Sequence, residues 1–136
     1  MKQSILSACA PLIQEELTFF SIFTSLEYDV NDENTVRVAG TGIFRSIMYV
    51  NESNTYSAIV QARKSRKLTF ASGRDCSICR KCDTRKICTA LGEMVLPLYL
   101  NGTYAGSLSM LCYKPDILKK MLEQTDFYKS LITHLG

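Results

Sequence analysis

The residues with the most distinctive chemistry lie in one short segment of this 136-residue chain. Four of its six cysteines occur there in a C-x2-C-x2-C-x5-C pattern: Cys76, Cys79, Cys82 and Cys88. Thiols at this density either hold a soft metal ion or cluster, or carry out redox chemistry. In a reducing compartment, clustered cysteines are more often metal ligands or catalytic groups than disulfides. We therefore take these four residues as candidate metal ligands.

The spacing favours an iron–sulfur cluster over zinc. Structural zinc sites usually join two short ligand pairs across a dozen or more residues, whereas all four thiols here lie within residues 76–88. The first three cysteines match the start of a bacterial ferredoxin run, although the fourth follows after five residues instead of three. An iron–sulfur cluster is therefore the preferred cofactor, and zinc, three-cysteine ligation and metal-free redox thiols stay open.

Cations are dense around the cysteines. Residues 63–86 include nine Arg and Lys side chains against Asp75 and Asp83. Four thiolates around a dication leave a net charge of about −2, and nearby cations stabilise such an anion. A solvated basic loop would show the same composition. Few aromatic residues interleave with these cations, so we expect no direct nucleic-acid binding.

Length and composition predict one ordinary globular domain. Hydrophobic residues make up 46% of the chain and charged residues 21%, and the net charge of +3 is too small to indicate a nucleic-acid or membrane partner. Glu15 and Glu16 interrupt the apolar N-terminal stretch, so no signal peptide is recognised, and no apolar run is long enough to span a membrane. We expect a cytoplasmic protein in which residues 1–136 form a single domain, with a cysteine-rich loop at 74–90.

A helix is expected near the N-terminus. Apolar residues recur at three- and four-residue intervals over residues 5–17. Pro11 is unfavourable inside a helix, so the helix either kinks there or its regular part begins there. Cys9 falls on the apolar stripe and Cys112 near the end of a strand, and we expect both to be buried as small hydrophobic side chains.

Strands and a second helix follow. Segments 25–30 and 35–39 alternate with period two and predict a hairpin with a four-residue connection. A helix is expected to begin at residues 53–55, and a short strand is expected at 67–70. Residues 43–50 are compatible with either strand or helix.

The clearest local signal is a hairpin before the last helix. Residues 94–100 and 103–113 are two β-rich runs joined by Asn101-Gly102, the pair that type I′ turns favour because both central residues need positive φ. Gly106 inside the second run indicates a bulge or a close backbone approach.

The C-terminal segment predicts one long helix. Pro115 suits the first helical position, and an apolar stripe continues to Leu135. The whole order is helix, hairpin, helix, strand, cysteine loop, hairpin and helix, which predicts an α+β fold with helices on one face of an antiparallel sheet. The apolar stripes of both terminal helices suggest a homodimer through a helical bundle.

This order of elements resembles a GAF domain. The likeness is most detailed over residues 59–115, where a helix with Ile59-Val60, the cysteine loop, a strand over 93–98 and a hairpin through Gly102 and Gly106 follow one another. This segment is similar to the sensory domains at the N-terminus of bacterial sigma-54-dependent transcriptional activators. The resemblance implies a GAF-like antiparallel sheet with the N- and C-terminal helices packed on one face. It also implies an output domain or the sigma-54 machinery as partner.

The resemblance favours a sensor of redox state, gas or metal that works through the cysteine loop. One alternative is a small-molecule-binding GAF module with structural zinc. A second is a GAF-type methionine sulfoxide reductase, to which Cys88 and Glu93 before the following strand are only loosely similar. His134 is the sole histidine, so a histidine-based catalytic site is not expected, and we expect no enzymatic activity. The chain has no phosphate-binding G-x-x-x-x-G-K-[ST] motif.

Overall fold

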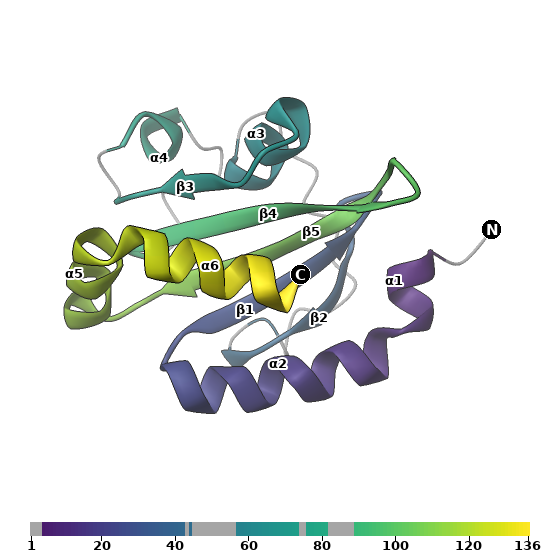
Figure 1. The fold of residues 1–136 in the computed structure, drawn as a ribbon, viewed down its shortest axis with the longest axis horizontal. Coiled ribbons are helices and arrows are strands. Elements are labelled where there is room, and N and C mark those ends of the chain that lie inside the picture. The colour runs from purple at the N-terminus through teal and green to yellow at the C-terminus, as the bar shows by residue number, and fades with distance from the viewer. Residues whose placement is uncertain (1–3, 43, 45–56, 74–75, 82–88) are drawn as a thin grey trace.

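The computed structural model describes residues 4–42, 44, 57–73, 76–81 and 89–136, with only the backbone at Cys79 and Lys81. Six helices and five strands follow one another within these residues (Figure 1). In chain order they are α1 (Ile5–Ala8), α2 (Ala10–Thr24), β1 (Glu27–Asp32), β2 (Arg37–Gly40), α3 (Ala58–Ser65), β3 (Thr69–Ala71), α4 (Ser77–Lys81), β4 (Gly92–Leu100), β5 (Thr103–Cys112), α5 (Pro115–Glu123) and α6 (Thr125–Leu135).

The strands form one antiparallel sheet in the order β2-β1-β5-β4-β3. The two predicted hairpins, β1–β2 and β4–β5, are both present, and β5 brings them together by pairing with β1. Asp32 closes the β1–β2 connection, since its carboxylate accepts hydrogen bonds from the backbone N–H groups of Asn34 and Val36 at 2.9 and 3.0 Å. The N- and C-terminal helices share one face of this sheet, as the sequence predicted.

The face under the terminal helices holds the main hydrophobic core. Side chains at alternate strand positions, such as Tyr28, Met94 and Met110, meet Leu17 from α2 and Ile132 from α6. All five are at most 4% exposed. Burial of this size, at about 25 cal/mol per Å² of apolar surface, is the main stabilising contribution to the fold.

Helices also cover the other face of the sheet. The sequence prediction had grouped the helices on one face. Val95, whose side chain points opposite to that of Met94, packs with Ala58, Ile59 and Ala62 of α3. Figure 1 shows α3 and α4 together on the β3–β4 side of the sheet. The domain therefore has three layers, and Cys76 packs in the interface between α3 and the sheet.

The N-terminal helix breaks as Pro11 predicted. α1 ends at Ala8 and α2 begins at Ala10, which places Pro11 within the first turn of α2, where a missing N–H costs nothing. The prediction that Cys9 is buried was wrong, because Cys9 lies at the break and is exposed. Leu12 is also 70% exposed, so the buried stripe of α2 is narrower than the sequence pattern indicated.

The β4–β5 turn has the predicted backbone. Asn101 and Gly102 have φ values of 52° and 80°, as a type I′ turn requires. Gly106 has a φ of 150° and lies against the backbone of Asn31, and the β4–β5 register shifts opposite it, between Leu98 and Tyr99. The expected bulge and the expected close approach are therefore both present.

Two predicted helices have different limits in the structure. The single C-terminal helix is divided at Gln124, where φ is −125° and ψ is 45°, into α5 and α6. The helix predicted from residues 53–55 is described from Ala58, and Ser57 caps it by accepting a hydrogen bond from the Val60 N–H. Residues 53–55, and most of the undecided segment 43–50, lie outside the described residues.

Candidate functional site

The cysteine segment is described only in its first part. Cys76 precedes α4 and Cys79 lies within it, so their backbones are one helical turn apart, while Cys82 and Cys88 lie outside the described residues. Whether the side chains of the four cysteines meet at one centre stays a prediction.

Cys76 is packed against the core beneath α3. Its half-buried side chain, with that of Ile78, contacts the cluster formed by Ala58, Ala71 and Val95. α4 also contacts β3. Any group bound by Cys76 would thus lie close to the layer that joins α3 to the sheet.

Cys112, outside the cysteine segment, is unsuited to ligation. Cys112 is completely buried, as predicted, and its thiol donates to the backbone carbonyl of Lys114 at 3.1 Å. Burial raises the pKa of the Cys112 thiol above its ordinary value of 9.0, which disfavours the thiolate that metals and redox reactions need.

A second group of functional side chains, which the sequence analysis missed, lies on the face of the sheet opposite the terminal helices. It comprises five buried polar residues on three adjacent strands, and we call it the polar face. Its members are Asp29, Asn31, Arg37, Ser107 and Ser109. The strand register places Asp29 opposite Ser109, and Asn31 opposite both Ser107 and Arg37.

A buried ion pair lies at one side of the polar face. Arg37 donates to both carboxylate oxygens of Asp29, from Nε at 2.6 Å and from Nη2 at 3.3 Å. The guanidinium also lies over the Phe44 ring, 4.7 Å from its centroid. Asn31 Nδ2 donates to the same carboxylate at 3.1 Å. Such hydrogen bonds offset part of the cost of burying two charges.

Three atoms of the polar face have no hydrogen-bond partner within the described part of the chain: Asn31 Oδ1, Ser107 Oγ and Ser109 Oγ. The phenol of Tyr104 lies near the Ser107 hydroxyl. Burial raises the pKa of Tyr104 above 10.0, and Ser107 and the Arg63 cation partly offset that rise. Buried polar atoms in folded proteins are nearly always paired, so three on one face indicate a place where a polar ligand or water binds.

The comparison with protein families and curated proteins gives one relative. No family model matches the chain. A protein named as a uric acid sigma-54-dependent transcriptional regulator, UacR of Escherichia coli strain K12, is 24% identical over 136 residues. The match covers 98% of this chain but only 23% of that protein's length.

Solved structures share the architecture. The second GAF domain of DevS from Mycobacterium smegmatis superposes with a TM-score of 0.53 at 16% identity, covering 96% of this chain and 99% of the other. The GAF domain of a sensor histidine kinase from Bacillus halodurans gives 0.55 at 14% identity, covering 84% and 86%. The chain has the GAF fold. The resemblance to GAF-like domains of sigma-54-dependent regulators, predicted from the sequence, is confirmed.

An enzyme shares this fold as well. The type II free methionine-R-sulfoxide reductase of Thermoplasma acidophilum superposes on this chain with a TM-score of 0.58 at 12% identity, covering 80% of this chain and 78% of the enzyme. At this identity the likeness shows the fold and carries no catalytic residue over to the chain.

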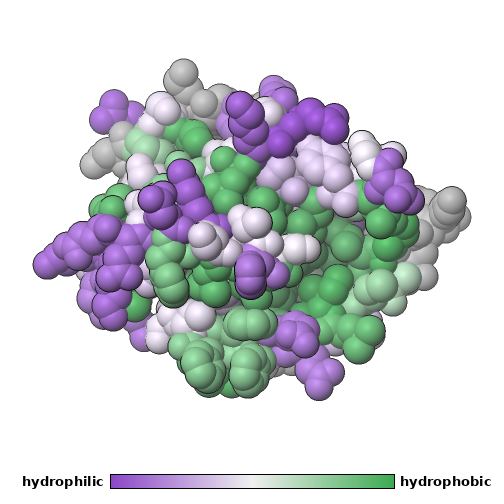
Figure 2. Space-filling model, viewed as in Figure 1, coloured by the Kyte–Doolittle hydropathy of each residue, from purple (hydrophilic) through white to green (hydrophobic). Residues whose placement is uncertain are grey.

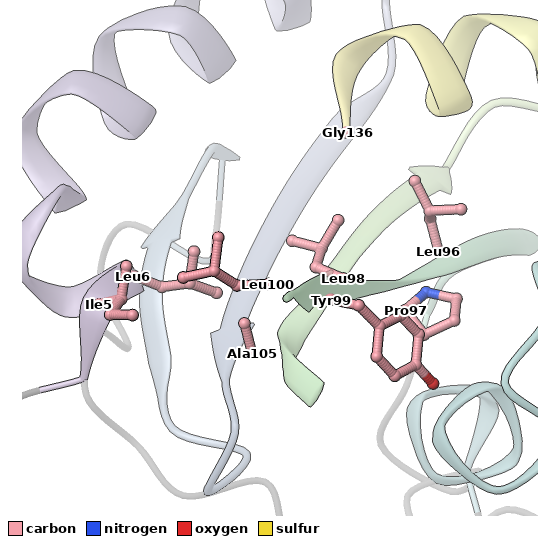
Figure 3. Close-up of a pocket in the computed structure, with 9 residues that line it drawn as sticks. All are labelled: Ile5, Leu6, Leu96, Pro97, Leu98, Tyr99, Leu100, Ala105 and Gly136. Atoms are coloured by element: carbon pink, nitrogen blue, oxygen red, sulfur yellow. The ribbon is translucent and has the colours of Figure 1, made fainter. Parts of the chain in front are cut away.

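Two other surfaces of the chain are apolar. An open groove of about 350 Å³ lies between α1, the β4–β5 hairpin and Gly136, lined by Leu6, Leu98 and other apolar residues. Figure 3 shows how these residues lie. On α2, four large side chains are at least 59% exposed, and Figure 2 shows apolar side chains along this edge of the molecule. The four are Leu12, Phe19, Ile22 and Phe23.

None of the helices that the structure describes combines the length and apolar character of a membrane span.

Proposed function

We propose that this GAF domain is the signal-sensing regulatory domain of a sigma-54-dependent transcriptional regulator. The observation that carries the proposal is the match of almost the whole chain to a short part of one such regulator. Because the chain spans about a quarter of that protein's length, the output functions of the regulator would belong to other domains. An output domain or the sigma-54 machinery is accordingly the partner we propose.

The signal in this proposal acts at the four cysteines. Cys76, Cys79, Cys82 and Cys88 would hold an iron–sulfur cluster, with zinc as the alternative. The contact of Cys76 with the core beneath α3 supports a sensory role. Loss or oxidation of a centre bound at Cys76 would disturb packing that connects α4 to α3 and the sheet. The exposed cations of α3, Arg63 and Lys64 among them, would stabilise a negatively charged centre.

Serine substitution tests the ligand set. We expect Cys79→Ser to lose most of the bound metal, because a hydroxyl is a poor ligand for soft metals. The matched control is Cys9→Ser, at an exposed position outside the segment, which should keep the metal content of the parent protein. Metal content is measured by elemental analysis after anaerobic purification. Full metal occupancy in both Cys79→Ser and Cys82→Ser would contradict the four-cysteine site.

We also propose that the domain forms a homodimer through α2. Phe19 and Phe23 stack with ring centroids 5.7 Å apart, and their side chains are 59% and 79% exposed. An exposed apolar patch of this kind is unfavourable in a monomer in water. Charged residues there should prevent association, so Phe19→Glu with Phe23→Glu is expected to halve the mass measured by light scattering. Lys119→Glu, on the exposed side of α5, is the control and should stay dimeric. A parent protein that is monomeric at high concentration would contradict this proposal.

The polar face supports a second candidate, the binding of a small molecule. Three unpaired buried atoms beside a paired arginine are the kind of polar group that orients a ligand in an otherwise apolar site. Uric acid, which appears in the name of the relative, is the ligand to test first. A reductase reaction is not proposed, because only the fold supports it.

A further inference from the structure

We propose that the polar face recognises its ligand through an amide edge, meaning an N–H donor directly beside a carbonyl acceptor, as in lactams and cyclic ureides. This proposal rests on the small-molecule binding proposed above. It adds the chemical class of the ligand and the residues that recognise it. The three residues concerned are Asn31, Ser107 and Ser109, all of which are 0% exposed.

The orientation of the Asn31 amide defines the first requirement. Its Nδ2 donates to Asp29 Oδ2 at 3.1 Å, and the reverse orientation would place the amide oxygen against a carboxylate oxygen. Asn31 Oδ1 is therefore left as a buried acceptor without a partner. A buried acceptor without a partner destabilises the fold, and an N–H donor of a ligand would satisfy it.

The serine hydroxyls define the second requirement. Ser107 lies directly opposite Asn31 in the β1–β5 register, and side chains so paired have Cβ atoms about 4.5–5.5 Å apart. Ser109 is the next residue along the same face. An acceptor at Asn31 beside a hydroxyl donor at Ser107 or Ser109 is complementary to an N–H group adjacent to a carbonyl oxygen.

The charges favour a neutral ligand edge. The Arg37 guanidinium and the Asp29 carboxylate form a two-point ion pair, so the five residues of the polar face together have no net charge. A charged ligand group would have to compete with that buried pair for a partner, whereas a neutral amide edge would not.

Alanine variants of the two serines distinguish a role in ligand binding from a role in folding. If Ser107 and Ser109 served only the fold, alanine would be at least as good, because it removes an unpaired hydroxyl at little change in volume. We therefore expect Ser109→Ala, and Ser107→Ala with Ser109→Ala, to unfold at the same temperature as the parent chain or a higher one. The same variants should bind the ligand at least tenfold more weakly. Ser130→Ala, exposed on α6, is the matched control and should change neither quantity.

The experiment is isothermal titration of the 136-residue chain with uric acid and with its tetra-N-methyl derivative. The derivative keeps the carbonyl acceptors and loses every N–H donor, and both titrations are run at a pH low enough to keep uric acid uncharged, so that the two compounds differ in donors and not in charge. The proposal predicts binding of uric acid, little or no binding of the derivative, and weakening in the serine variants alone.

Three results would overturn the proposal. Equal affinity for the two compounds would show that the N–H donors of the ligand are not recognised. Binding that is unchanged in the serine variants would place the ligand elsewhere and leave the proposed small-molecule function intact. No binding of uric acid would remove that function and leave the polar face to ordered water only.

Discussion

Replacing Arg37 with leucine should lower the free energy of unfolding by about 3–5 kcal/mol, because it removes the Arg37 cation from the buried carboxylate of Asp29. Both residues are at most 3% exposed, so water cannot replace the lost partner. The change is measured by urea unfolding. Lys64→Leu, at an exposed position of α3, is the control and should alter stability by less than about 0.5 kcal/mol.

A double variant isolates the charge from the packing. Asp29→Leu with Arg37→Leu removes both buried charges, and it should lose less stability than the sum of the two single variants. A loss of unfolding free energy below about 1 kcal/mol for Arg37→Leu alone would mean that Asp29 is protonated or otherwise compensated. The ion pair would then not account for the neutrality of the polar face.

Gly106→Ala should destabilise the domain by more than about 3 kcal/mol, which combines backbone strain with a steric clash. A Cβ atom at Gly106 would overlap the backbone carbonyl oxygen of Asn31, and the φ of 150° is itself strained for any residue but glycine. β5 and β1 would have to separate at the point where Asn31 presents its amide. The measurement is again urea unfolding.

Two other glycines separate the causes of that loss. Gly102→Ala has a positive φ of 80° but no heavy atom within 4 Å of the new Cβ, so it should show the backbone strain alone. Gly73→Ala has open space around the new Cβ and no positive φ, and it should cost little. If Gly106→Ala costs no more than Gly102→Ala, the close approach to Asn31 does not constrain the sheet.

The parts of the fold that the sequence predicted well depend on local chemistry. Asn101-Gly102 determines a turn type through the φ values of two residues, and Pro11 limits where α2 can begin. The break at Gln124 has no comparable signal, because no proline or glycine stands there. Pro11 signals the break between α1 and α2, but the apolar spacing alone did not show that Cys9 would lie at this break and be exposed.

The candidate sites divide in the same way. The spacing of the four cysteines is visible in the sequence, although only Cys76 and Cys79 lie among the described residues. The polar face could not be found from the sequence, because Asp29 and Asn31 alternate with apolar residues as they would on a solvent-facing strand. The sequence does not show that β1 lies inside the sheet, between β2 and β5, where both residues are buried. The Oγ atoms of Ser107 and Ser109 on β5 then lie on the same polar face, without a hydrogen-bond partner.

The metal content and absorption spectrum of protein purified without oxygen test the central claim, that the cysteine segment of this GAF-like domain holds a sensory centre. The account predicts iron with acid-labile sulfide and a broad absorbance near about 400 nm, as cysteine-ligated clusters show. One zinc per chain without colour would support the alternative metal and assign signal detection to the polar face. Protein that contains neither metal, in its parent form and before any substitution, would contradict the claim.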